Sequence, residues 1–253
     1  MPTRRLMTRE LYNARDLGGI PTKDGKVTCF GVFVRSEAPV GLSQADIQYL
    51  KDYGVAASMD FRSTGEMEAR PSDLRNVMPY YPRPLFNEAA IIGGKKPPMP
   101  KQLSWGEQYI SMAEDSRQWA VDVLNIAAQC PGALLYHCTT GKDRTGLMTC
   151  YLLSIAGAER ADIAADYSVS QIFLEPVYEK IRNGAMRLGP AMDGPGKKRP
   201  PMDESFFQTP AAAMLTLIDD LTARYGSVVD YLRTIGVTEE TMEQIREKFV
   251  ENP

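Results

Sequence analysis

The stretch YHCTTGKDRTG, residues 136–146, joins two apolar segments through a short polar loop. The preceding segment, 133–137, reads as a buried strand, and the following one, 145–158, is apolar on nearly every side and reads as a central helix. Between Cys138 and Arg144 lie only small or polar residues, including a glycine that permits left-handed backbone. The pattern predicts a tight strand–loop–helix turn.

A turn of this kind can bind an oxyanion. Its backbone N–H groups can point inward as a nest, and the next helix adds the partial positive charge of its N-terminus. Arg144 adds a planar guanidinium that matches two phosphate oxygens. The same field favours the thiolate of Cys138, since comparable environments lower a cysteine pKa to about 3.5–7.5. We therefore expect Cys138 to attack phosphorus and form a cysteinyl-phosphate, in a phosphate-binding loop made of Thr139, Thr140, Gly141, Lys142, Asp143 and Arg144.

Two further residues of this stretch flank the proposed nucleophile and the arginine. Thr145 directly follows Arg144, and its hydroxyl can reach the sulfur and steady it as a leaving group. His137 lies beside Cys138, but adjacent residues at a strand end point to opposite faces. We interpret His137 as a buried residue behind the loop that hydrogen-bonds the backbone, with proton transfer as the alternative.

The spacing of Cys138 and Arg144 occurs a second time, at Cys29 and Arg35. The residues between this second pair are Phe, Gly, Val, Phe and Val, which favour an extended strand over 27–36. At about 3.3 Å per residue the two side chains would lie about 20 Å apart and could not grip one anion. We expect Cys29 to be a buried strand residue.

Strand and helix patterns alternate along the rest of the chain. The expected elements are a helix over 43–54 capped by Ser43, a strand over 55–61, helical structure over 104–129, and helices that open at Thr209 as cap with Pro210, near Ser227 and near Thr238. This alternation predicts an α/β fold with a central, mainly parallel sheet flanked by helices. We expect a single domain over 1–253.

Two segments, 91–102 and 188–203, are dense in Gly, Pro and Lys and read as long loops. We take 91–102 and the wider range 170–210 as candidate lid segments. The alternative is a solvated connection.

The composition excludes several classes of protein. The chain has 253 residues, a net charge of −3 and 24% charged residues, and this acidic balance argues against a nucleic-acid binder. No apolar run of 18 residues occurs, so we expect no stable membrane insertion. Four scattered cysteines and one histidine predict neither a disulfide framework nor a metal site, and nothing implies a cofactor. A cytoplasmic protein is expected, with export without a standard signal peptide as an alternative.

The motif HCTTGKDRTG resembles the signature loop of the cysteine-dependent protein tyrosine phosphatases. It is most similar to the bacterial group that contains tyrosine phosphatase B and the listerial lipid phosphatase, whose loop reads His-Cys-x-x-Gly-Lys-Asp-Arg-Thr-Gly. Other elements of that group are matched in order by NARDLGG (13–19), FVRSEAP (33–39), MDFRSTGEMEARP (59–71), ADYSVS (165–170) and the segment 225–247. The resemblance covers nearly the whole chain.

The resemblance implies a phosphatase fold and activity on phosphotyrosine, extending in this group to phosphoserine, phosphothreonine and phosphoinositides. The general acid that protonates the leaving oxygen is then Asp143, a role typically worth about 10²- to 10⁴-fold in rate. Asp60 is a second candidate because it ends a strand, where α/β sites gather; its alternative is an ion pair with a neighbouring arginine. Lys142 would add positive charge at the rim, or be a solvated surface residue.

Arg15, Asp16 and Arg62 have two open interpretations, a buried network that fixes loops and direct contact with substrate. The partner is expected to be a phosphorylated protein or a phosphoinositide, and the oligomeric state is not indicated. A phosphoinositide or inositol-phosphate phosphatase is the first alternative function, with Lys95–Lys96 and 197–199 meeting additional phosphates. An inactive phosphate-binding module is the second.

Overall fold

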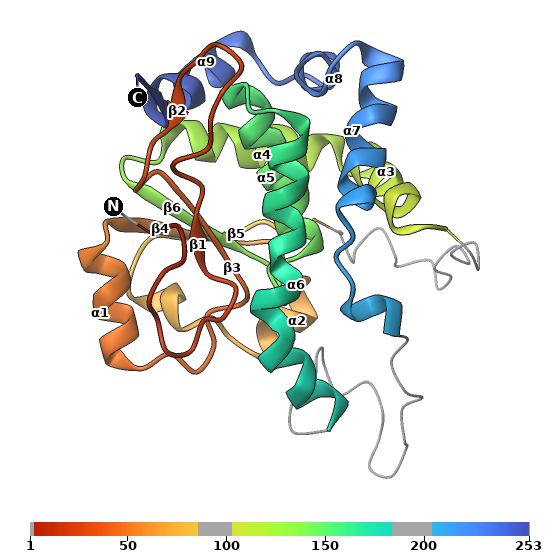
Figure 1. The fold of residues 1–253 in the computed structure, drawn as a ribbon. Helices are drawn as coiled ribbons and strands as arrows, with labels where there is room; N and C mark the ends of the chain where they lie inside the picture. The colour runs from red at the N-terminus through yellow and green to blue at the C-terminus, as the bar shows by residue number, and fades with distance from the viewer. Residues whose placement is uncertain (1–2, 86–102, 184–203, 253) are drawn as a thin grey trace.

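The computed structural model describes residues 3–85, 103–183 and 204–252 (Figure 1). Its main sheet has the strand order β1-β3-β6-β4-β5. The strands are β1 Arg15–Asp16, β3 Phe33–Ser36, β4 Val55–Asp60, β5 Tyr80–Pro82 and β6 Ala133–His137. Only β1 pairs antiparallel, and the other three pairings are parallel. The predicted α/β fold with a mainly parallel sheet is confirmed.

The register of the sheet brings three strand ends together. His137 of β6 is paired with Ser36 of β3 on one side and with Asp60 of β4 on the other. Because these strands are parallel, the loops that follow them leave the same edge of the sheet, which is where α/β folds place their sites. The loop after His137 is therefore central at this edge.

Helices cover both faces of the sheet, and β6 shows why. Leu134 and Tyr136 lie in the larger core with α4 (Arg117–Gln129) and α5 (Asp143–Ala156), whereas Ala133 and Leu135 lie in a smaller core with α1 (Gln44–Asp52). Successive strand residues point to opposite faces, so a strand that is apolar throughout must be covered on both. Figure 1 shows α1 on one side of the sheet and α4 and α5 on the other.

Five of the described α-helices begin at a side-chain cap. Ser43, Ser63, Ser104, Ser227 and Thr238 each accept a hydrogen bond from a backbone N–H of the first turn. The helices are α1 Gln44–Asp52, α2 Thr64–Ala69, α3 Trp105–Asp115, α4 Arg117–Gln129, α5 Asp143–Ala156, α6 Arg160–Arg182, α7 Ala211–Tyr225, α8 Val228–Thr234 and α9 Glu239–Phe249, with one-turn helices η1 Asp73–Asn76 and η3 Glu204–Phe207.

The expected strand over 27–36 is wrong in its continuity. A turn at Gly31, which has a φ of 74°, separates β2 Val27–Thr28 from β3, and β2 pairs instead with β7 Val250–Glu251. Cys29 lies outside both strands and is partly exposed, so it is not the buried strand residue that we expected. Glycine at positive φ carries this turn without strain.

Two helix boundaries also differ from expectation. The helical range 104–129 is divided at Ser116, whose Oγ donates to the Met112 carbonyl 2.6 Å away and ends α3. The helix expected to be capped by Thr209 begins at Ala211 with Pro210 at the N-cap position. The Thr209 hydroxyl donates to the carbonyl of Ser168 instead, which ties this segment to α6.

The candidate lid segments are only partly described. Within 170–210, the first residues continue α6 to Arg182 and Glu204–Phe207 form η3. Residues 184–203 and the whole of 91–102 lie outside the described residues. In the described part of the chain, no helix has both the length and the apolar character needed to cross a membrane. The cytoplasmic location stays a prediction.

Candidate active site

The loop between β6 and α5 has a shape that only glycine allows at one position. Gly141 has a φ of 68°, and a Cβ added there would lie 2.3 Å from the Ser36 carbonyl oxygen. Both the left-handed backbone and the close approach of β3 therefore exclude a side chain. The loop is pressed against the end of the neighbouring strand.

Two buried side chains hold this loop from outside. Asn13 Nδ2 donates to the carbonyls of Thr140, at 3.0 Å, and Gly141, at 3.2 Å. Arg35 Nη2 donates to the same Gly141 carbonyl at 2.7 Å. In a trans peptide the C=O and the next N–H point in opposite directions. The N–H groups of Gly141 and Lys142 therefore point to the inner side of the loop, as an anion nest requires.

A buried charge network supports these contacts. Asp166 of α6 accepts from Arg15 Nε at 3.1 Å and Arg35 Nη1 at 2.7 Å, and it also pairs with Arg4. Burial alone would raise the pKa of Asp166, but the three guanidinium groups hold it well below its usual range. The structure places Arg15 in this network. It also places Asp16 away from the loop, accepting from the N–H groups of Gly18 and Gly31.

Cys138 and Arg144 occupy the two ends of the loop. Cys138 follows the last residue of β6 and is 2% exposed. Burial lowers the pKa of Arg144, but its hydrogen bonds to Glu66 and the negative charge of Glu66 raise it by more. The guanidinium is therefore a permanent cation next to the thiol.

Arg144 donates most of its N–H groups to protein acceptors. Nη1 donates to Glu66 Oε2 at 2.7 Å and to the Phe61 carbonyl at 3.3 Å. Nη2 donates to Glu66 Oε1 at 3.0 Å and to Thr139 Oγ1 at 3.1 Å. Among the described residues, Nε–H has no acceptor. A phosphate can therefore bind side-on, through Nε and through Nη2 once the Thr139 hydroxyl turns away.

Glu66 is a site residue that the sequence reasoning missed. It belongs to the capping box of α2, in which its carboxylate accepts from the Ser63 N–H at 2.9 Å. Burial raises the pKa of Glu66, but the bonds from Arg144 lower it by more, to about 2. The Ser-x-x-Glu spacing of the cap was readable in the sequence, whereas its contact with Arg144 was not.

Asp143 is the first residue of α5 and has a 23% exposed side chain. Its Oδ1 accepts a hydrogen bond of 2.5 Å from the Tyr109 hydroxyl, which is also 2.5 Å from the Tyr167 hydroxyl. These two tyrosines come from α3 and α6, so no local sequence pattern links them to the loop.

Asp60 lies in a different environment, with no exposed surface. Its carboxylate accepts from Arg62 Nε at 3.0 Å, from Arg62 Nη2 at 2.6 Å and from the Tyr80 hydroxyl at 2.6 Å. Burial raises the pKa of Asp60, but the charges of His137 and Arg62 and the hydrogen bonds from Arg62 and Tyr80 bring it to about 2. Arg62 thus lies in a buried ion pair.

His137 is fully buried behind the loop, with Nδ1 3.4 Å from the Cys138 carbonyl oxygen. Burial lowers the pKa of His137 to about 4, so the ring is neutral at pH 7. This placement fits the loop-supporting interpretation better than proton transfer to a substrate.

Lys142 does not lie at the rim, where the family resemblance had put it. It is fully buried, and its Nζ donates to the carbonyls of Phe206, at 2.6 Å, and Gln208, at 3.3 Å. The ammonium also lies 4.6 Å from the centre of the Trp105 ring. In this state Lys142 ties the η3 segment to the loop and is not free to meet a phosphate. Thr145 is also buried, and its Oγ1 has no hydrogen-bond partner in the described part of the chain.

Comparisons with known proteins place the chain in a family. The model of the tyrosine phosphatase family matches residues 6–251. The chain belongs to the tyrosine phosphatase family. The expected resemblance is confirmed, and with it an enzyme of the phosphotyrosine-hydrolysing class.

Three relatives show how far the similarity extends. A tyrosine-protein phosphatase of Nostoc commune is 31% identical over 220 residues, covering 85% of this chain and 72% of the relative. A putative tyrosine-protein phosphatase of Cupriavidus necator is 31% identical over 163 residues, covering 62% of this chain and 59% of the relative. The triple specificity protein phosphatase PtpB of Mycobacterium tuberculosis is 27% identical over 118 residues, covering 45% and 42%.

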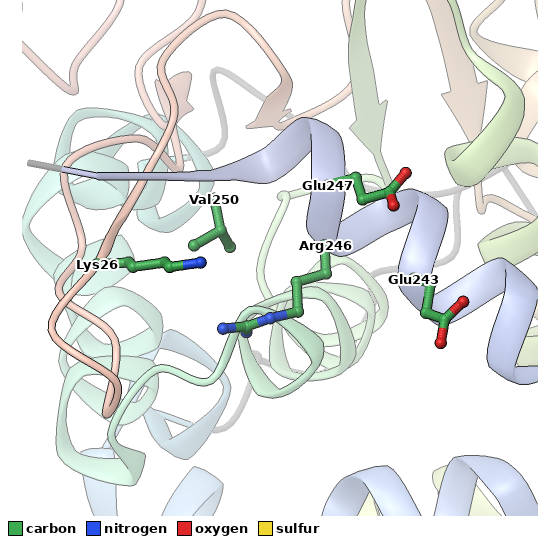
Figure 2. A pocket seen from close by; sticks show the side chains of 5 residues that line it. All are labelled: Lys26, Glu243, Arg246, Glu247 and Val250. Atoms are coloured by element: carbon green, nitrogen blue, oxygen red, sulfur yellow. The ribbon is translucent and has the colours of Figure 1, made fainter.

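A hollow of about 170 Å³ lies away from the phosphatase loop (Figure 2). It is lined by Lys26, Glu243, Arg246, Glu247 and Val250. Arg246 donates to the carbonyls of Ile155 and Ala156 at the C-terminal end of α5. The loop is at the other end of this helix, about 20 Å away at 1.5 Å per residue. The hollow therefore takes no part in the site.

Proposed function

We propose that this phosphatase hydrolyses phosphotyrosine through a cysteinyl-phosphate intermediate. The observation that carries the proposal is the loop itself, whose carbonyls are bound from outside while Cys138 and Arg144 hold its two ends. In the first step Cys138 Sγ attacks phosphorus and the bond to the tyrosyl oxygen breaks, with Asp143 giving its proton to that oxygen. In the second step water attacks phosphorus, its proton passes to Asp143, and the thiolate leaves.

The proton donor in this proposal is Asp143 and not Asp60. The Asp143 side chain is partly exposed at the start of α5, and Oδ2 has no acceptor or donor among the described residues. Both oxygens of Asp60 accept bonds from Arg62, and Tyr80 adds another. A carboxylate held in this way, with a pKa of about 2, is a poor acid at neutral pH.

Thr145 and the inner N–H groups complete the proposed chemistry. The unpartnered Thr145 hydroxyl lies next to Arg144 and can donate to the sulfur as it leaves. The N–H groups of Gly141 and Lys142 face the equatorial oxygens. In this proposal Thr139, Thr140, Gly141, Lys142, Asp143 and Arg144 contribute backbone to the phosphate site, and the Lys142 side chain has a structural part. The family match from 6 to 251 supports one catalytic domain over 1–253.

A substrate panel with Cys138→Ser tests the proposal. We expect phosphotyrosine peptides to be hydrolysed, with slower turnover of phosphoserine and phosphothreonine peptides. A specificity broader than phosphotyrosine would be in line with the mycobacterial relative, which is named a triple specificity protein phosphatase. Cys138→Ser should fall below about 1% of wild-type turnover while still binding substrate. Cys29→Ser, at the partly exposed cysteine with the same spacing to an arginine, is the matched control and should keep full activity.

The panel also separates the alternatives. A tenfold or greater preference for inositol phosphates or phosphoinositides would show the lipid-phosphatase alternative. Tight binding of phosphopeptides without turnover by the wild type would show an inactive binding module. Turnover that survives in Cys138→Ser would contradict the covalent mechanism.

A further inference from the structure

The general acid proposed above is the end of a chain of buried hydroxyl groups. Tyr109 of α3 and Tyr167 of α6 are each 1% exposed, and their hydroxyl oxygens are 2.5 Å apart. The Tyr109 hydroxyl is also 2.5 Å from Asp143 Oδ1. Residues of three helices, α3, α5 and α6, are thus joined in one chain of hydrogen bonds that ends at the Asp143 carboxyl group.

Counting protons gives this chain a direction. Burial raises the pKa of both phenols, so each keeps its single proton at neutral pH. Tyr167 has no other hydrogen-bond acceptor in the described part of the chain, so its buried O–H must be given to Tyr109. Tyr109 then gives its own proton to Asp143 Oδ1. The reverse direction would leave the Tyr167 proton buried without an acceptor, which is costly.

We propose that Tyr109, supported by Tyr167, is a positioning residue that assigns the two oxygens of Asp143 their roles; this inference rests on the function proposed above. Oδ1 is occupied as an acceptor, so the acidic proton is carried by Oδ2. When Asp143 protonates the leaving oxygen, the Tyr109 O–H stabilises the carboxylate that forms. When water attacks in the second step, Oδ2 takes its proton and Oδ1 stays bound to Tyr109.

Other polar groups surround Asp143 and contribute to its charge balance. Lys142 Nζ is 3.7 Å from Oδ1 but is held by the carbonyls of Phe206 and Gln208. Arg144 acts on Asp143 through space from the same loop, and Tyr178 does so from α6. Of these neighbours and the two tyrosines, only Tyr109 has a recorded hydrogen bond to the Asp143 side chain. Removing the Tyr109 hydroxyl is therefore the selective way to change the hydrogen bonding of the Asp143 carboxyl group.

The rings are held independently of their hydroxyl groups, which makes the test practical. The Tyr109 and Tyr167 rings pack edge to face, with centroids 5.6 Å apart at 84°. Phenylalanine keeps this packing and removes only the hydroxyl. Tyr231→Phe is the matched control, because its buried hydroxyl also bonds to α3, at the Ala113 carbonyl, but does not reach Asp143.

The experiment measures kcat/KM against pH for two substrates. One is phosphotyrosine, whose phenolate is a poor leaving group, and the other is an activated aryl phosphate. We expect Tyr109→Phe to reduce kcat/KM about tenfold for phosphotyrosine and little for the activated ester. Losing the Tyr109 hydrogen bond removes stabilisation from the Asp143 carboxylate, so the high-pH limb of the kcat/KM profile should move to higher pH. Tyr167→Phe should show a smaller change in the same direction, and Tyr231→Phe none.

A double-mutant cycle decides whether Tyr109 acts through Asp143. In an Asp143→Asn background, Tyr109→Phe should have no further effect. An equal loss for both substrates, or the same loss in the Asp143→Asn background, would overturn the inference and show a packing role only. If Tyr109→Phe fails to fold, an unchanged pH profile of Tyr167→Phe would overturn it. The proposed function fails separately, through turnover that survives in Cys138→Ser.

Discussion

Both ends of α5 hold a guanidinium group, with opposite relations to the helix. At the C-terminal end Arg246 donates to the carbonyls of Ile155 and Ala156, where the partial negative charge of the helix favours a cation. At the N-terminal end Arg144 lies in the first turn, where the helix disfavours a cation. The first arrangement stabilises the fold. In the second, Glu66 offsets the unfavourable position of Arg144, and the guanidinium is placed to bind an anion in the proposed site. Such departures from a local preference are expected at functional sites, so the N-terminal end of α5 is the functional end in our proposal.

The largest effect that tests this contrast is expected from Arg144→Lys. Lysine keeps the charge but loses the planar fork, so kcat/KM should fall by about 10²- to 10³-fold. Arg246→Lys makes the same change at the other end and should leave turnover within about twofold. Steady-state kinetics of both purified variants give the measurement. Comparable losses in the two would remove the distinction between the ends.

Glu66→Gln sharpens the contrast, because it takes away the compensating charge at the functional end. We expect kcat/KM to fall about tenfold, since the guanidinium is no longer held by a charged, bidentate partner. Glu68→Gln changes an exposed residue of the same helix and is the control. Full activity of Glu66→Gln would mean that the loop alone orients Arg144.

The chain's one histidine, His137, is the last residue of β6 and lies directly before the loop that leads into α5. Its burial predicts a pH dependence of stability. Burial lowers the pKa of His137 from 6.5 to about 4. Between these values the unfolded chain binds the additional proton, so the His137 contribution is complete above about pH 6.5 and is lost as pH falls toward 4. Glu37, whose pKa burial raises to about 7, acts in the opposite sense over part of this range.

Urea unfolding of wild type and His137→Gln at several pH values isolates the histidine term. The difference in the free energy of unfolding should grow with pH across this window and be constant above it. Parallel curves would show that His137 keeps an ordinary pKa in the folded protein.

The smallest effect is expected from Arg246→Ala. Losing a partly exposed cation at the C-terminal end should lower the free energy of unfolding by about 1 kcal/mol. Activity at saturating substrate should not change, because the loop lies at the other end of α5. Thermal or denaturant unfolding beside a turnover assay checks both statements. A loss of activity without a loss of stability would contradict this division of roles.

The sequence predicted those parts of the structure that depend on neighbouring residues. The strand 133–137 and the helix after the loop follow from local apolar patterns, and the caps at Ser43, Ser227 and Thr238 follow from side chains that reach their own first turn. The interruption at Gly31 is indicated by the glycine itself, but the surrounding β-branched residues favour a continuous strand.

The contacts that the sequence could not predict join residues far apart in the chain. Tyr109 and Tyr167 reach Asp143 from two other helices, and the partners of Lys142 lie at 206 and 208. Because its side chain is charged, a lysine in a phosphate-binding loop is expected from the sequence to be exposed to solvent. Only tertiary structure shows that backbone carbonyls and an aromatic ring satisfy that charge in the interior.

The position of β6 determines which part of the enzyme unfolds last. This strand has partners on both edges and side chains buried on both faces, so its amides should exchange with solvent only in the rarest, near-global fluctuations. Cys138, the proposed nucleophile, is the next residue along the chain. The loop proposed to meet water and substrate is thus attached to the strand that unfolds last. We expect slow deuterium uptake at the amides of β6 up to His137, the residue before the loop.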